Sequence, residues 1–169
     1  MKSDYLRRLT VSQSIEFDLD TEQLWELISA GGNLNSSHPF CKTNEVIIWE
    51  NEKHSDRLVY LNGRTYIRNF QTGEEGKGYT LLIGEENGPQ SFVEWVIESV
   101  GDKSKLTITV YPFILAKLPK ILAFIPHKLW VQPRLNSYLK SVLMGFNHHA
   151  TTGETVPRNH FGKHPWFSD

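Results

Sequence analysis

Apolar residues recur with regular spacing in the first thirty residues. They alternate with polar ones over residues 11–17, "VSQSIEF", which is typical of a strand with one buried face. Asp20 follows, with Gln23 three residues further on, and this capping-box pattern predicts the start of a helix. Gly31 and Gly32 end the helix. Its apolar stripe consists of Leu24, Leu27 and Ile28.

Six further strands are predicted between residues 45 and 111, because short runs rich in β-branched and aromatic residues alternate with polar turns. Asn62-Gly63 separates two of these runs and favours a two-residue type I′ hairpin turn. "NEKHSD", residues 51–56, is interpreted as a turn. The predicted strands cover residues 45–50, 57–61, 64–70, 79–84, 90–100 and 105–111.

A long amphipathic helix closes the regular part of the chain and is expected to begin near Pro126 or Pro133, since proline suits the first turn of a helix. Its apolar positions are Leu135, Tyr138, Leu139, Val142 and Phe146. The tail, residues 151–169, has no periodicity. It carries Phe161, Trp166 and Phe167, so part of it is expected to pack on the body.

This order of elements, β-α-β6-α, predicts an α+β fold in a single domain spanning residues 1–169. A six-strand meander is antiparallel and strongly twisted, and only the C-terminal helix is long enough to cover its concave face. A helix lying across a curved sheet seldom fills it completely. A ligand cavity is therefore expected between the two.

The opening "VSQSIEFDLDTEQLWELIS", the six-strand run and the closing amphipathic helix resemble the START-related helix-grip superfamily, also called SRPBCC. That group includes polyketide cyclase/dehydrase-type proteins, lipid-transfer domains and the major birch-pollen allergen. The resemblance covers about residues 8–150 and rests on the order and spacing of elements. It implies a strongly curved seven-stranded sheet wrapped on the C-terminal helix. It also implies a hydrophobic small molecule bound between them, in a protein that need not be an enzyme.

The most apolar stretch, "PFILAKLPKILAFIPHKLWVQP" at residues 112–133, contains four prolines. Its uninterrupted part is too short for a membrane span, which needs roughly 20 apolar residues. Pro119 is expected to break it into two short helical pieces. Three interpretations stay open: the insert, residues 113–126, packs on the domain, forms a lid at the cavity mouth, or lies on a lipid surface beside its lysines. The lid hypothesis makes Leu118 and Leu122 candidate ligand contacts.

Composition narrows the classes of function. The chain of 169 residues has 18 basic and 19 acidic residues, a net charge of −1, so nothing favours a nucleic-acid partner. One cysteine excludes an internal disulfide and a thiolate-rich zinc site. The N-terminus has no apolar run typical of a signal peptide, and a cytoplasmic location is expected. No sequence feature calls for a metal or cofactor.

Few residues are candidates for catalysis, and the sequence has no strong enzymatic motif. His38 and Cys41 share one loop and are the candidate catalytic residues, because a histidine within hydrogen-bond reach makes a thiol nucleophilic. The plainer interpretation is a His-Pro turn with a small buried thiol. Arg68 either pairs with Glu94 or Glu98 on the surface or points into the cavity to hold an anionic group. The remaining predicted ligand contacts are the aromatic residues Trp49, Tyr60, Tyr66, Trp95 and Tyr138.

Three functions are therefore considered. The first is the binding or carrying of a hydrophobic or amphipathic small molecule. The second is a cyclase/dehydrase-type enzyme with a pocket histidine or tyrosine as acid or base, which predicts a cavity group with a strongly perturbed pKa. The third is an interaction module that docks on a protein or a membrane through residues 113–125, which predicts an exposed apolar patch.

Overall fold

The computed structural model describes residues 5–169 and confirms the predicted order of strands and helices. A short helix that the sequence analysis did not anticipate, α3, follows the first helix. In chain order the elements are β1 (Val11–Phe17), α2 (Thr21–Ser29), α3 (Leu34–Ser37), β2 (Cys41–Glu50), β3 (Lys53–Tyr60), β4 (Thr65–Glu74), β5 (Gly78–Gly84), β6 (Gln90–Val100), β7 (Lys103–Tyr111), α4 (Lys120–Pro126), the π-helical η1 (His127–Val131) and α5 (Gln132–Thr152).

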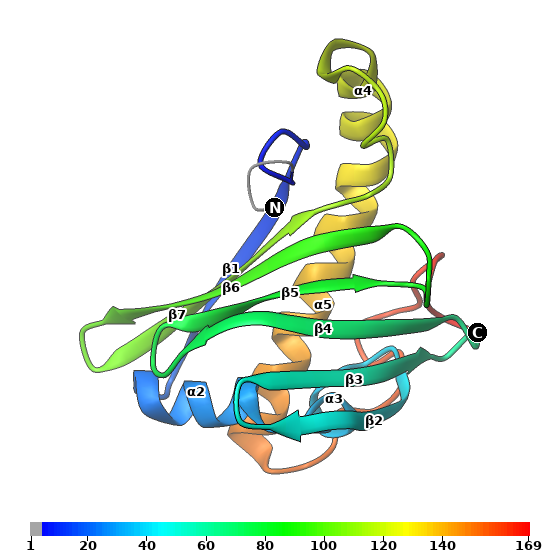
Figure 1. The fold of residues 1–169 in the computed structure, drawn as a ribbon. Helices are drawn as coiled ribbons and strands as arrows, with labels where there is room; N and C mark the ends of the chain where they lie inside the picture. The colour runs from blue at the N-terminus through cyan, green and yellow to red at the C-terminus, as the bar shows by residue number, and fades with distance from the viewer. Residues whose placement is uncertain (1–4) are drawn as a thin grey trace.

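The seven strands form one antiparallel sheet in the order β1-β7-β6-β5-β4-β3-β2. The meander runs from β2 to β7, and β1 joins β7 at one edge, so the sheet stays open. Helix α5 crosses one face of the sheet, and α2 and α3 lie at one end of it (Figure 1). Trp95 of β6 meets Phe146 of α5 with ring centroids 5.4 Å apart. This is the predicted α+β helix-grip architecture.

Local signals in the first part of the chain are confirmed. The Asp20 carboxylate accepts a hydrogen bond from the Gln23 amide at 2.8 Å, and the Gln23 side chain accepts one from the Asp20 amide at 3.1 Å. This reciprocal cap satisfies two backbone donors that the first turn of a helix otherwise leaves free. Leu24 and Ile28 are buried under the sheet's end.

The β3–β4 hairpin forms where it was predicted, but its turn type differs. Gly63 has a φ of 85°, whereas Asn62 has an ordinary negative φ, so the type I′ prediction is wrong. The Gly63 amide donates to the Tyr60 carbonyl at 2.9 Å, and the Tyr60 amide donates to the Arg64 carbonyl at 2.8 Å. These bonds describe a three-residue loop with glycine in the left-handed position, the next most common hairpin connection.

The turn predicted at residues 51–56 is much shorter, because β3 already begins at Lys53. The prediction was wrong because polar residues in this stretch were interpreted as turn residues. His54 packs on Trp49, with ring centroids 4.8 Å apart, and Asp56 is fully buried opposite Arg68 of β4. Aspartate is typical of turns in isolation. Here cross-strand partners hold both residues in a strand.

Pro119 interrupts the apolar segment, but two short helical pieces do not form. Residues 113–118 form turns, and one continuous helix begins after Pro119. Pro119 is the N-cap of α4, and the helix then passes through Pro126 into η1 and α5. Proline lacks the amide that an α-helix interior requires. The π-helical turn begins directly after Pro126, where the regular hydrogen-bond pattern is already interrupted. Helix α5 itself begins at Gln132, with Pro133 in its first turn as predicted, and α4 and η1 extend it toward the N-terminus.

Helix α5 approaches α3 closely at Gly145. A Cβ atom at this position would lie 2.2 Å from the carbonyl oxygen of Ser37, so only glycine allows this packing. His38 follows Ser37 directly and is the C-cap of α3. The contact thus determines where along α5 the side chain of His38 lies.

The tail packs on the body, as predicted from its aromatic residues. Phe167 is buried and stacks on Tyr60 with a centroid separation of 4.2 Å. Trp166 meets Trp130 of η1 at 5.4 Å. The tail therefore contributes to the same region as the closing helix and β3.

Candidate ligand-binding cavity

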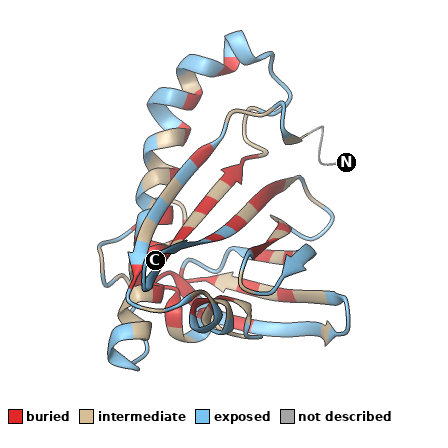
Figure 2. Cartoon of the chain, turned by 90° about the vertical axis from the view of Figure 1, so that its left-hand side faces the viewer, coloured by how far each residue is buried: buried red, intermediate tan, exposed pale blue. Residues whose placement is uncertain are grey.

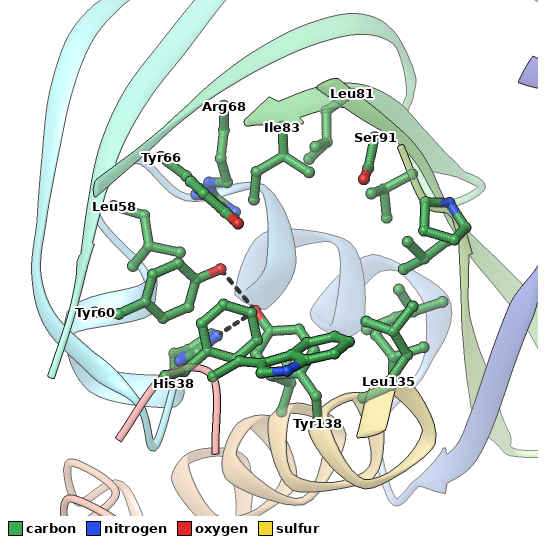
Figure 3. Close-up of a pocket in the computed structure, with 18 of the residues that line it drawn as sticks. His38, Leu58, Tyr60, Tyr66, Arg68, Leu81, Ile83, Ser91, Leu135 and Tyr138 are labelled. Atoms are coloured by element: carbon green, nitrogen blue, oxygen red, sulfur yellow. Dashed lines mark hydrogen bonds between the residues drawn. The ribbon is translucent and has the colours of Figure 1, made fainter. Parts of the chain in front are cut away.

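A cavity of about 310 Å³ lies between the inner face of the sheet and α5 (Figure 3). Its walls are mostly apolar and come from β3 to β7, α5, the chain after β7 and the tail. The lining residues are Leu34, His38, Leu58, Tyr60, Arg64, Tyr66, Arg68, Leu81, Ile83, Ser91, Val93, Trp95, Ile108, Val110, Pro112, Phe113, Ile114, Trp130, Leu135, Tyr138, Leu139, Val142, Trp166 and Phe167.

Three polar side chains meet at one wall of this cavity. Nε2 of His38 lies 2.9 Å from the hydroxyl of Tyr138, and that hydroxyl lies 3.1 Å from the hydroxyl of Tyr60 (Figure 3). The three residues come from the end of α3, from α5 and from the end of β3. Sequence separations of 78 and 100 residues between the partners mean that only the fold brings them together.

A hydrogen bond from the backbone determines which ring nitrogen of His38 carries the proton. The amide of Phe40 donates to Nδ1 of His38 at 3.2 Å, so Nδ1 is an acceptor and the ring proton sits on Nε2. Nε2 therefore donates to the Tyr138 hydroxyl. Burial, together with the nearby positive charge of Arg68, lowers the pKa of His38 to about 3, and the ring is neutral at pH 7.

The tyrosine pair retains one hydrogen that a ligand can accept. The two phenols carry two hydroxyl hydrogens, and only one is used between them. The other has no partner among residues 5–169 and is available to an acceptor in the cavity. Burial raises the pKa of both Tyr60 and Tyr138 above the usual range, so each phenol keeps its proton.

Arg68 points inward from β4, and its charge is already compensated. Its Nε donates to Asp56 at 2.7 Å, and its terminal nitrogen donates to the second oxygen of the same carboxylate. Burial alone would lower the pKa of Arg68, but Asp56 raises it above its ordinary value. The surface pairing expected from the sequence is wrong, because Asp56 and not a glutamate is the partner. Arg68 does line the cavity, as the alternative interpretation expected, but Asp56 occupies its carboxylate-binding fork before any ligand arrives.

The two glutamates expected as partners of Arg68 bind elsewhere. Glu94 accepts a hydrogen bond from the Tyr111 hydroxyl at 2.8 Å. Glu98 pairs with Lys105 at 2.7 Å. Both belong to the outer face of the sheet, since alternation along β6 turns Trp95 inward and its neighbours outward.

The structure brings most of the predicted ligand contacts to this cavity. Tyr60, Tyr66, Arg68, Trp95 and Tyr138 line it, as does His38. Trp49 does not, because it lies with His54 and Phe70 in a separate hollow of about 450 Å³ beside α2. Leu118 and Leu122 are exposed on the projecting α4 region and lie outside the cavity walls.

The Cys–His nucleophile is not supported by the geometry. His38 directs its ring nitrogens to Phe40 and Tyr138 and makes no side-chain bond to Cys41. Burial raises the pKa of Cys41 to about 12, so its sulfur remains a protonated thiol at neutral pH. Cys41 does not line the cavity.

Several lining residues had no distinguishing signal in the sequence. Ser91 accepts a hydrogen bond from the Phe113 amide at 3.1 Å and so holds the chain after β7 against the cavity. Trp130 and Trp166 approach it from the helix and the tail. The aromatic residues of the tail gave a hint, because they were expected to pack on the body. Within residues 5–169 no cluster of three or more possible metal ligands is present.

Comparisons with known proteins identify the fold. No family model matches the chain, and no curated protein matches it either. TTHA0849 from Thermus thermophilus is similar in structure, with a TM-score of 0.68 at 17% identity over 86% of this chain and 99% of that one.

Two further structures come from biosynthetic settings. DynU16, a protein of the dynemicin biosynthetic locus, has a TM-score of 0.65 at 13% identity over 86% of this chain. The di-domain ARO/CYC BexL from the BE-7585A biosynthetic pathway has a TM-score of 0.63 at 12% identity over 85% of this chain. This chain spans 48% of DynU16 and 46% of BexL. At such low identity the likeness shows the fold alone, and that fold is the helix-grip architecture.

Proposed function

We propose that this protein binds a hydrophobic or amphipathic small molecule in the cavity between the sheet and α5. The observation that carries the proposal is an apolar cavity of about 310 Å³ in which one hydroxyl hydrogen of the Tyr60–Tyr138 pair is left for a ligand. A volume near the lower end of the usual range for small-molecule sites, roughly 300–1,000 Å³, favours a compact ring system. The free hydrogen favours a ligand with a carbonyl or similar acceptor.

The electrostatics of the cavity support a neutral ligand. Asp56 compensates the charge of Arg68, His38 is neutral at pH 7, and both phenols stay protonated. An anionic ligand would lose its hydration on entering the cavity. It would gain no free cation there, because Arg68 is already paired with Asp56. A ketone or phenol loses less on transfer and gains the tyrosine hydrogen bond.

A cyclase-type enzyme is the second candidate function. The chain of hydrogen bonds from His38 through Tyr138 to Tyr60 favours it, because such a chain polarises a carbonyl at its end. An acid–base residue works best with a pKa near the working pH. His38, with a pKa of about 3, and phenols with raised pKa values are far from that condition, which supports binding as the first candidate.

Native mass spectrometry of the gently purified protein, followed by organic extraction, separates these functions. A discrete extra mass that is released on denaturation and recovered unchanged after incubation with fresh protein supports a binding role. A bound molecule that the protein converts into a different mass supports the enzyme.

Filling the cavity is expected to abolish binding of a compact apolar probe. Ile83 is half-buried on the cavity wall, and Ile83→Trp places an indole where the ligand would sit. We expect calorimetry with the bicyclic ketone tetralone to show binding to the wild type and at least about a tenfold weaker affinity for this variant. Val96→Trp, on the exposed face of β6, is the matched control and should bind as the wild type does. Equal affinities of all three proteins would place the ligand outside the cavity.

Removing both tyrosine hydroxyls is expected to weaken binding only when the ligand has an acceptor. In Tyr138→Phe alone, the Tyr60 hydroxyl keeps a hydrogen that it can donate, so the test variant is Tyr60→Phe/Tyr138→Phe. A lost neutral hydrogen bond costs about 0.5–1.5 kcal/mol, so tetralone should bind roughly 2- to 12-fold more weakly to this double variant. Its hydrocarbon analogue tetralin should bind the wild type and the double variant alike. A parallel loss for both ligands would mean that the two tyrosines act by shaping the wall and not as hydrogen-bond donors.

A further inference from the structure

Helix α4, the residues just before it and the η1 turn after it carry large apolar side chains that are exposed to solvent within residues 5–169. Ile121 is 87% exposed and Leu129 is 72% exposed, values that are unusual for such residues. The helix projects beyond the ends of the strands (Figure 1), and most of its residues are coloured as exposed (Figure 2). The exposed apolar residues of this region are Leu118, Ile121, Leu122, Phe124, Ile125, Leu129 and Trp130. We call them the α4 face.

The α4 face lies in a stretch of chain with only positive charge. No aspartate or glutamate occurs between Lys103 and Gly153 in the sequence. Lys117 and Lys120 flank the start of α4, and Lys128 lies over the ring of Phe124 at 5.7 Å. Arg134 lies over Trp130 at 5.1 Å. A net charge near zero for the whole chain therefore conceals a basic end.

The N-terminal segment adds to this basic end. Arg7 and Arg8 share a shallow hollow with Leu118 and Lys120, so arginine and lysine side chains from two distant parts of the chain gather beside the α4 face. Leu6, next to these arginines, is itself half exposed. An exposed apolar surface rimmed by cations, with Trp130 at its border, matches the composition of interfacial membrane-binding helices.

We propose that the α4 face docks on an anionic lipid surface, with its apolar side chains among the headgroups and Lys117, Lys120 and Lys128 on the lipid phosphates. The charge pattern selects this occupant. A second copy meeting this face in a two-fold contact would oppose lysines with lysines. Insertion is interfacial, because no helix within residues 5–169 is long and apolar enough to cross a membrane.

The α4 face borders the cavity. Trp130 belongs to the α4 face and also lines the cavity, together with Phe113 and Ile114 from the chain that leads to α4. Docking would therefore bring this border of the cavity to the bilayer, from which an apolar molecule could enter without crossing water. This last step rests on the proposed function, whereas docking itself does not require an occupied cavity.

Flotation with lipid vesicles tests the docking. We expect the wild type to float with vesicles of equal parts phosphatidylcholine and phosphatidylglycerol, and only weakly with phosphatidylcholine alone. Ile121→Glu/Leu129→Glu should lower the partition coefficient by at least about tenfold. Replacing Lys117, Lys120 and Lys128 with glutamine should lower it roughly a hundredfold on the anionic vesicles, since each basic residue near such a surface contributes about fivefold. The matched control Ile47→Glu/Val96→Glu changes two exposed apolar residues of the sheet and should float as the wild type does.

Any one of three results would overturn the proposal. The wild type stays in solution with both kinds of vesicle, the control loses as much binding as the α4 variant, or light scattering shows a dimer that Ile121→Glu/Leu129→Glu abolishes while vesicles do not bind. The affinity of Ile121→Glu/Leu129→Glu for tetralone distinguishes failure of the docking proposal from failure of the proposed ligand binding in the cavity. Neither Ile121 nor Leu129 lines the cavity, so that affinity should be unchanged.

Discussion

Replacing Arg68 with methionine is expected to lower the free energy of unfolding by about 3–5 kcal/mol. Arg68 is 3% exposed and Asp56 is 0% exposed, and the two side chains form a two-pronged ion pair across β3 and β4. Methionine keeps most of the volume of the side chain but leaves the Asp56 carboxylate buried without a cation. The cost comes from that isolated carboxylate rather than from lost packing.

Two comparisons isolate this effect in urea unfolding. The double variant Asp56→Leu/Arg68→Met removes both charges, and we expect it to recover most of the lost stability, because buried pairs contribute little over apolar residues. Lys105→Met breaks the exposed pair with Glu98, whose side chain is about half exposed, and should cost less than about 1 kcal/mol. If Arg68→Met unfolds at the same urea concentration as Lys105→Met, the isolated Asp56 side chain does not carry the expected cost.

Acidification below about pH 6.5 is expected to destabilise the protein through His38. The pKa of His38 is lowered to about 3 by burial and by Arg68, whereas in the unfolded chain it is near 6.5. Between these values the unfolded chain binds the proton and the folded protein does not. Stability is therefore complete above pH 6.5 and falls as the pH decreases, by a factor approaching ten in the folding equilibrium per pH unit. At pH 3 this single group accounts for roughly a thousandfold change.

The His38→Gln variant separates this contribution from the others. Glutamine retains one donor for Tyr138 and one acceptor for the Phe40 amide but does not titrate. Burial also lowers the pKa values of His127 and His164, so the variant should keep part of the acid sensitivity. The quantity to measure is the difference in urea midpoint between the two proteins at pH 7 and at pH 4. If the difference in urea midpoint is the same at both pH values, His38 is protonated in the folded protein at pH 4.

The two expected effects concern the same wall of the cavity. Arg68 contributes to the low pKa of His38, and its pairing with Asp56 keeps the guanidinium in place. Loss of Asp56 alone would leave an uncompensated cation close to the imidazole and lower its pKa further. Stability and the hydrogen-bonding state of the candidate site are therefore coupled through one ion pair.

Local features of the chain were sufficient for the order of elements. Alternation in residues 11–17, the Asp20–Gln23 cap and the apolar stripe around Leu139 each depend on neighbours within one or two turns or on a single strand. Such preferences act before any long-range contact forms, so they can be recognised in one sequence. The turn at Gly63 was located for the same reason, although its type depended on the flanking strands.

The candidate site was only partly accessible from the sequence. Tyr66 and Arg68 both line the cavity, because alternation along β4 turns residues two apart to the same face. Which of the two faces points to the cavity depends on the twist and packing of the whole sheet. Trp49 was misassigned for a different reason, because the cavity occupies only part of the length of the strands. Trp49 lies beside α2 with Phe70, which contacts the buried Tyr79 at 5.1 Å, and no local pattern shows which end of a strand borders the cavity.

Short-range spacing along the chain was thus enough to predict the strands, the capped helix, the closing helix and the supply of aromatic residues. The partners of these residues depended on the fold. It placed Asp56 opposite Arg68, brought His38, Tyr138 and Tyr60 into one chain of hydrogen bonds, laid Phe167 on the cavity and left Ile121 and Leu129 in solvent. Burial and pairing between residues far apart in the chain depend on how every element packs, and no local pattern records that outcome.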